Sequence, residues 1–211
     1  INQGTVRAAF YAAEAAKSSL GTGAITLNGA TSLLDLDVPL NGLLDFPRTL
    51  TNTINGAAGT FQKSGGSTLT LAGGGNFAGD FRVTNGTLVL TGASHGLGRA
   101  FYLAPMAPGD LVTLQVGTTS DSAMQVYDFD QEIVGDQSTT LVKDGLGVMN
   151  FNAADADGNA DFYGVITLAS GTLNVQAIRA LGNGNIIGTT SGTKLIFSET
   201  GTFGIRIRKV E

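Results

Sequence analysis

The 211-residue chain contains no cysteine and no tryptophan, and its only histidine is His95. The absence of cysteine excludes disulfides, thiolate metal sites and cysteine nucleophiles. A histidine-based triad or a multi-histidine metal site would have to depend on His95 alone, which lies in a glycine-bounded turn and is expected to be an exposed loop histidine. We therefore predict no catalytic residue, no metal ligand and no cofactor.

Charged residues are also scarce, at 14% of the chain against a typical value of about 25%. The formal net charge is −5, and no basic patch suited to nucleic acid or to an anionic membrane surface is present. Only four prolines occur and no G-X-Y period accompanies them, which excludes collagen. No apolar run approaches the ~18 residues of a membrane-spanning helix. No nucleic-acid partner is expected.

Glycine is the residue in excess, with 31 copies, roughly twice the usual share of ~7%. Hydrophobic residues reach 42%, which is enough for a sizeable core. Many short runs alternate apolar and polar residues, as in Leu69-Thr70-Leu71, and Asn-Gly or Asp-Gly steps separate them. These features predict an all-β fold of many short strands. The alanine-rich segment near residues 7–19 is the exception and predicts a short helix.

Two stretches of the chain, Lys63 to Gly98 and Lys143 to Gly182, carry the same marks in the same order. Each has a lysine, a glycine, an alternating strand, a loop with asparagine and phenylalanine, then Gly-Thr-Leu and Leu-Gly. A third, degenerate copy opens the chain. We predict one unit spanning 1–211, with repeat-like parts at about 1–60, 61–142 and 143–211. Because a solenoid turn takes roughly twenty-odd residues, about nine or ten rungs are expected.

These marks resemble the passenger-associated transport repeat of bacterial autotransporters. The resemblance implies a right-handed parallel β-helix that is displayed on a Gram-negative cell surface or secreted, upstream of a C-terminal outer-membrane barrel. It implies adhesion or cell–cell self-association, with a second copy on a neighbouring cell or a host surface protein or glycan as partner. The alternative role is a structural stem that promotes secretion and holds a distal functional region away from the cell.

Two further interpretations concern the fold and the ends of the chain. Asn-Gly steps are typical of two-residue hairpins, so an antiparallel β-sandwich or barrel is the alternative fold. The chain begins at Ile1 without a methionine or a signal peptide and closes on a strand-like segment. We interpret it as a piece of a longer protein, so that the missing signal says little about secretion.

Five acidic residues are the predicted surface interaction residues: Asp128, Asp130, Asp155, Asp157 and Asp161. The first two flank Phe129 on a strand, which places both carboxylates on one face about 7 Å apart. Glycosidases use carboxylates at ~5–9.5 Å, so a polysaccharide lyase or hydrolase is a minor alternative. No histidine or basic residue lies nearby in sequence, and a solvated strand face is the favoured interpretation.

The segment 155–161 resembles a calcium loop only superficially. Placing Gly158 at the sixth position of an EF-hand loop puts Ala153 first and Gly164 twelfth, so two ligands are lost. An acidic turn is the better interpretation. The 25 threonines are the other surface feature, since many fall on the polar side of strands: Thr68, Thr70, Thr87, Thr139, Thr140 and Thr172. A flat wall of this kind can pair with another rod through many weak hydrogen bonds, and the alternative is that the threonines only reflect β-propensity on a solvated face.

Overall fold

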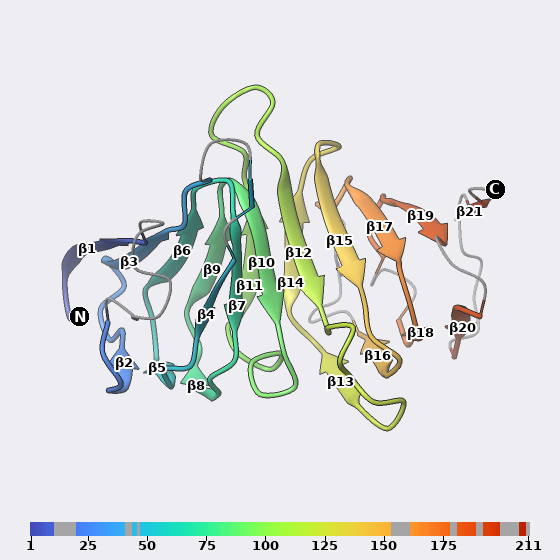
Figure 1. Cartoon of the computed structure of the whole chain (residues 1–211), viewed down its shortest axis with the longest axis horizontal. Helices are drawn as coiled ribbons and strands as arrows, with labels where there is room; N and C mark the ends of the chain where they lie inside the picture. The colour runs from blue at the N-terminus through green and yellow to red at the C-terminus, as the bar shows by residue number, and fades with distance from the viewer. Residues whose placement is uncertain are drawn as a thin grey trace.

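The chain is described by a computed structural model that covers residues 1–10, 20–40, 44–45, 47–152, 161–177, 181–188 and 192–198, with the backbone alone at 207–209. It is an all-β parallel solenoid of about seven turns. The strands lie side by side along the long axis, from the N-terminal end to the C-terminal end (Figure 1). The predicted all-β solenoid class is thereby confirmed.

Four parallel sheets line the sides of the solenoid. The six-stranded sheet has the order β1 (Gly4–Ala9), β3 (Ser32–Asp37), β6 (Thr60–Ser64), β9 (Asp80–Val83), β11 (Ala100–Leu103) and β14 (Glu132–Gly135). The eight-stranded sheet has the order β21 (Ile207–Lys209), β19 (Asn185–Gly188), β17 (Val165–Leu168), β15 (Thr139–Lys143), β12 (Val112–Val116), β10 (Gly86–Leu90), β7 (Thr68–Leu71) and β4 (Arg48–Leu50).

The third side of the solenoid is divided between two shorter sheets. The three-stranded sheet has the order β2 (Ile25–Thr26), β5 (Ile54–Gly56) and β8 (Gly75–Phe77). The four-stranded sheet has the order β13 (Val126–Phe129), β16 (Val148–Phe151), β18 (Thr172–Val175) and β20 (Lys194–Phe197). The first lies toward the N-terminal end and the second toward the C-terminal end (Figure 1).

Consecutive strands visit the sides in turn. For example, β14, β15 and β16 belong to the six-, eight- and four-stranded sheets. Every strand pair in the described part of the chain is parallel. Parallel neighbours require a crossover between them rather than a hairpin, so the alternative antiparallel sandwich is excluded.

The core fills the interior with aligned columns of apolar side chains. In the eight-stranded sheet one inward column is entirely aliphatic and is formed in register by Leu69, Leu88, Leu114, Leu141, Ile166 and Ile186. A column of phenylalanines runs beside it, from the six-stranded sheet into the four-stranded sheet. Its successive ring centroids are 5.1, 4.9, 5.6 and 5.6 Å apart, and its members are Phe61, Phe81, Phe101, Phe129 and Phe151. Period-two alternation therefore produces one continuous core.

The prediction of nine or ten rungs is wrong, because several turns are longer than roughly twenty residues. Thr68 pairs with Thr87, only 19 positions on, but Ala100 pairs with Glu132, 32 positions on. The extra length lies in the loops between strands, such as the one before β12 that projects from the rod (Figure 1). Fewer turns therefore fit into 211 residues.

The prediction of a short helix near residues 7–19 is also wrong over the part of that segment that the structure describes. Residues 7–9 belong to β1, which pairs in parallel with β3, and residues 11–19 lie outside the described part of the chain. Arg7 forms ion pairs with Asp35 and Asp37 of β3. Tertiary pairing thus overrides the modest helix propensity of the alanines.

The two sequence copies are related by a shift around the solenoid. Gly86 is the first residue of β10 at the entrance to the eight-stranded sheet, whereas Gly171 directly precedes β18 at the entrance to the four-stranded sheet. Their φ angles are 71° and 73°, values that favour glycine. The repeat therefore encodes the same turn conformation at two different corners of the rod.

Candidate interaction surface

The predicted acids Asp128 and Asp130 lie on the exposed side of β13 and directly after it. Each carboxylate accepts a hydrogen bond from an asparagine of the next rung. The Nδ2 of Asn150 donates to Oδ1 of Asp128 at 2.7 Å, and the Nδ2 of Asn152 donates to Oδ1 of Asp130 at 2.7 Å. Asp161 is exposed in the turn before β17. Asp155 and Asp157 lie outside the described residues.

The contact between Asp128 and Asn150 begins a ladder that continues along the four-stranded sheet. Asn174 donates to Oδ1 of Asn150 at 2.9 Å, and the hydroxyl of Ser198 donates to Oδ1 of Asn174 at 2.6 Å. Such ladders form where equivalent positions of stacked strands carry amide side chains. The carboxylate of Asp128 is the terminal acceptor of this ladder, so its local role is to order neighbouring rungs.

The outer face of the eight-stranded sheet has a different character, because it carries no charged side chain from β7 through β19. We call this surface the threonine wall. Its outward positions are Thr68, Thr70, Thr87, Val89, Thr113, Gln115, Thr140, Val142, Val165, Thr167, Asn185 and Ile187. Val89 is buried by its neighbours, and the other positions are partly or fully exposed. In a chain with 12 basic and 17 acidic residues, an uncharged face that extends over six strands is a distinct surface.

The most regular part of the threonine wall is a row of four hydroxyl-bearing residues. Thr87 stands in register with Thr68 on one side and Thr113 on the other, and Thr113 stands in register with Thr140. Adjacent strands are about 4.8 Å apart, so the row repeats at that interval along the rod. All four side chains are partly exposed, and at the N-terminal end of the row the Thr68 hydroxyl donates to Oδ2 of Asp45 at 2.8 Å. The result is a flat array of groups that both donate and accept hydrogen bonds.

Sequence reasoning found part of this wall and misassigned part of it. Thr139 was expected on the polar side, but it points inward and is fully buried, with its hydroxyl donating to the Asp136 carbonyl at 2.7 Å. Thr172 is outward but belongs to the four-stranded sheet. Thr113 and Thr167 were missed, although each alternates with buried aliphatic residues, which is the signal that could have identified them.

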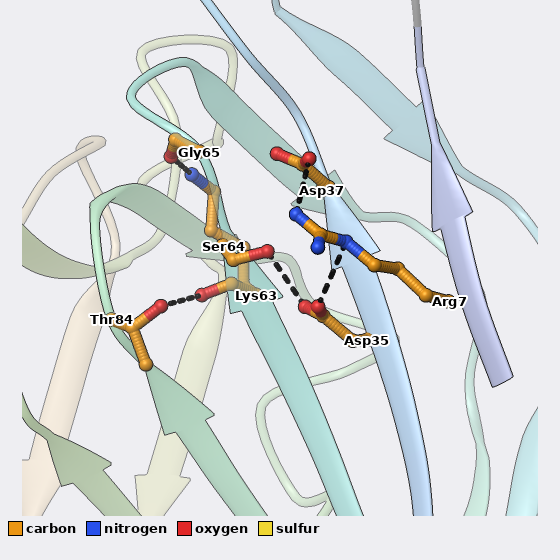
Figure 2. A network of polar contacts seen from close by, with 7 residues as sticks. All are labelled: Arg7, Asp35, Asp37, Lys63, Ser64, Gly65 and Thr84. Carbon is orange, nitrogen blue, oxygen red and sulfur yellow. Dashed lines mark hydrogen bonds and ion pairs between the residues drawn. The ribbon is translucent and has the colours of Figure 1, made fainter. Parts of the chain in front are cut away.

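The two lysines that mark the sequence copies are both buried. The Lys63 side chain reaches the corner that follows β6. There its Nζ donates to the carbonyl oxygens of Gly65 and Asn85, the latter at 2.7 Å. Figure 2 shows this side chain turned toward Gly65 and away from the polar residues on the outer face of the sheet. Burial lowers the pKa of Lys63 to about 8, and the charges of Asp37, Asp45 and Asp35 oppose that shift.

Lys143 makes the corresponding contacts at the next corner. Its Nζ donates to the carbonyl oxygens of Asp144 at 2.5 Å and Gly145 at 2.9 Å, and burial lowers its pKa. Buried backbone carbonyls need a donor, and the two ammonium groups supply one at each corner. Both lysines are therefore structural, and the resemblance between the copies reflects this shared task.

His95 differs from the exposed loop histidine that its sequence context predicts. It is half-buried, and its ring packs edge-on against Tyr127 with centroids 5.3 Å apart. The Tyr127 hydroxyl donates to Asp121, and burial together with that hydrogen bond raises the pKa of Tyr127. Lys143 lies 5.9 Å above the same ring. The tyrosine ring is fully buried, so this cluster consolidates the corner.

In the described residues, no group of three or more histidine, aspartate or glutamate side chains is arranged to hold a metal ion. The described segments also contain no helix of the length and apolarity needed to cross a membrane. In comparisons with known proteins, no family model, no curated protein and no solved structure matches the chain.

Proposed function

We propose that the chain is a non-catalytic, self-associating segment of a surface-displayed bacterial autotransporter passenger, and that the threonine wall is its adhesive face. The observation that carries the proposal is the outer surface of the eight-stranded sheet from β7 through β19, on which these strands place no charged side chain, with its row Thr68, Thr87, Thr113 and Thr140. The partner is a second copy of the chain on a neighbouring cell.

Hydroxyl groups suit self-association because each is at once donor and acceptor. The same surface can therefore face its own copy in a two-fold arrangement, in which every contact occurs twice. Two copies that each carry a net charge of −5 repel one another over most of their surfaces. The threonine wall is the long face on which this repulsion is locally absent.

Contacts of this type are individually weak, with a net value of about 0.5–1.5 kcal/mol for a hydrogen bond between neutral groups. Repetition along the rod, and between many rods on two cells, converts weak contacts into strong adhesion through effective concentration. The assignment to a passenger rests on the order of marks in the two sequence copies. The parallel solenoid is compatible with it, because rungs of this kind can fold one upon another as the chain emerges.

A structural stem is the second candidate function. It is favoured by the continuous phenylalanine column and by the two buried lysines at the corners, features that stabilise the rod without requiring a ligand. Deletion of residues 61–182 from the full-length protein separates the candidates. Lost secretion supports the stem, whereas normal display with lost cell clumping supports the adhesive segment.

Analytical ultracentrifugation over a wide concentration range tests self-association directly. We expect the unmodified chain to associate at high concentration and the Thr113→Glu variant to remain monomeric, because it places a charge in the centre of the wall. The matched control is Thr172→Glu, which places the same charge on an outward position of the four-stranded sheet. A monomeric unmodified chain, or equal effects of the two substitutions, would contradict the proposal.

A further inference from the structure

The outer face of the six-stranded sheet divides into two parts. Toward the N-terminus its charged side chains satisfy one another, as Figure 2 shows. Arg7 pairs with Asp37 at 2.7 Å and with Asp35 at 3.4 Å, and the hydroxyl of Ser64 donates to Asp35 at 2.7 Å. This part is a closed polar network with no free cation.

The middle of the same face contains polar groups without such partners. Gln62, Arg82 and Tyr102 stand in register on three successive strands, β6, β9 and β11. Arg82 is exposed and Tyr102 is partly exposed. Within the described residues, neither the Arg82 guanidinium nor the Tyr102 hydroxyl has a hydrogen-bond or ion-pair partner. Three different hydrogen-bonding groups are thus presented at the rung interval of about 4.8 Å.

Arg82 and Tyr102 line a shallow depression of about 340 Å³, together with Thr60, Asp80 and Ala104. Its lining combines an aromatic ring and a methyl group with hydroxyl groups, a carboxylate and a guanidinium. Ligand sites commonly have this composition, in which apolar surface supplies contact area and a few polar groups set orientation. Tyrosine contributes both, since it has an apolar body and a polar tip.

The depression is lined by one carboxylate, that of Asp80, as well as by the Arg82 guanidinium. Asp80 is already engaged by Arg99, whose Nε donates at 3.1 Å and whose Nη2 donates to both carboxylate oxygens at 2.9 Å. Glu132 acts on the same arginine, since it and Asp80 both raise the pKa of Arg99, with the hydrogen bond to Asp80 as the largest cause. Arg82 is consequently the cation of this face that has no carboxylate of its own.

We propose that this depression binds a carboxylate-bearing sugar of an acidic, linear glycan. The Arg82 guanidinium takes the sugar carboxylate in a two-point hydrogen-bonded ion pair, the geometry that its planar fork favours. The ring of Tyr102 packs against the apolar face of the sugar, and Thr60 and Gln62 meet its hydroxyls. Because the rungs repeat along the axis, the glycan chain lies along the rod and across successive strands.

This inference deepens the proposed adhesive function by naming a ligand class, but it uses a different side of the solenoid. The threonine wall lies on the eight-stranded sheet, and the depression lies on the six-stranded sheet. If the chain binds glycan but does not self-associate, the glycan site is supported and the adhesive role of the threonine wall is contradicted. If the chain self-associates but does not bind glycan, the threonine wall is supported and the glycan site is contradicted.

Isothermal titration calorimetry of the unmodified chain with a short linear oligouronate tests the proposal, with the neutral oligomer of the same linkage for comparison. We expect binding of the oligouronate only. Arg82→Gln should weaken it about tenfold or more, since charge-assisted hydrogen bonds are lost, and Tyr102→Ala should weaken it as well. The charge-matched control is Lys194→Gln, which removes a positive charge from the exposed end of β20 on another sheet.

The control variant should bind within about twofold of the unmodified chain, because a general change in net charge acts equally in both substitutions. Three results would overturn the proposal: no binding of the oligouronate, equal binding of the neutral oligomer, or equal losses in the Arg82→Gln and Lys194→Gln variants. Circular dichroism of each variant confirms that an observed loss does not arise from unfolding.

Discussion

The ammonium nitrogen of Lys63 lies 2.7 Å from the carbonyl oxygen of Asn85, a residue 22 positions later and one turn along the solenoid. The contact joins two successive rungs at a corner where the backbone turns away from the sheet. It therefore connects a buried charge to the stacking of rungs, and the stability of the rod should depend on the protonation of that lysine.

The pKa of Lys63 is lowered to about 8 by burial, against 10.5 in the unfolded chain. Between these values the unfolded chain holds a proton that the folded chain has released, so the free energy of unfolding should rise with pH across this window. One pKa unit is worth about 1.4 kcal/mol, which limits the rise to about 3 kcal/mol. Chemical denaturation across the whole interval, from about pH 7.5 to 11, measures it.

The matched variant for this measurement is Lys63→Met, which removes the titrating group but keeps a long side chain. The pKa of Lys143 is also lowered, but both proteins retain Lys143, so the difference between their pH profiles reports on Lys63. At neutral pH the variant should lose about 1–3 kcal/mol, because the carbonyls of Gly65 and Asn85 lose their donor. Identical pH profiles for the two proteins would refute the assignment.

Phe101 stands in the middle of the phenylalanine column, with Phe81 at 4.9 Å and Phe129 at 5.6 Å between ring centroids. Its side chain is fully buried. Phe101→Ala should destabilise the chain by about 3–5 kcal/mol, because the cavity interrupts a core shared by neighbouring rungs. Phe101→Leu, which preserves most of the volume, should cost much less. Thermal or urea unfolding of both variants checks the difference, and similar losses would argue against the column.

Gly171 has a φ angle of 73°, and a Cβ at this position would collide with the carbonyl oxygens of Gly145 and Gly147 on the preceding rung. Gly171→Ala should therefore destabilise the chain by more than about 1 kcal/mol. Gly96→Ala is the control, since a Cβ there meets no atom within 4 Å and its φ is not in the left-handed region. Equal unfolding midpoints for the two variants would show that close stacking at this corner is unimportant.

Asn150 links Asp128 to Asn174 in the ladder on the four-stranded sheet. Asn150→Asp replaces the donor to Asp128 with a second carboxylate, and like charges on adjacent strands cost about 0.2–1 kcal/mol. The loss should disappear in acid, where protonation of one carboxylate removes the repulsion. Asn150→Thr removes the amide without adding a charge, so its smaller effect should not depend on pH. Unfolding at neutral and acidic pH distinguishes the two variants.

Several strands escaped prediction for a common reason. The short strand β5 (Ile54–Gly56) is bounded by polar and glycine residues, and β14 (Glu132–Gly135) has one fully buried large side chain, Ile133. Neither contains enough alternation to be distinguished from a loop. Their extended conformation comes from parallel neighbours roughly 20 to 30 residues away, β8 and β11. Local periodicity cannot report a partner at that distance.

The candidate site residues show the same division. The alternation around Phe129 was sufficient to place Asp128 and Asp130 on one exposed side of a strand. It could not show that asparagines 22 positions later donate to both carboxylates. Likewise, Arg82 is an ordinary basic residue in the sequence, and only the stacking of β6, β9 and β11 brings it beside Gln62 and Tyr102.

By itself, the sequence determined the class of fold and its local rules: short strands with one buried face, and turns that need glycine. These follow from side-chain alternation and from backbone conformations that only glycine adopts easily, both of which are local properties. The tertiary structure decided which side chains share a face of the rod. Because that depends on the length of each turn, 19 residues in one place and 32 in another, the threonine wall and the Arg82 depression exist only in the assembled solenoid.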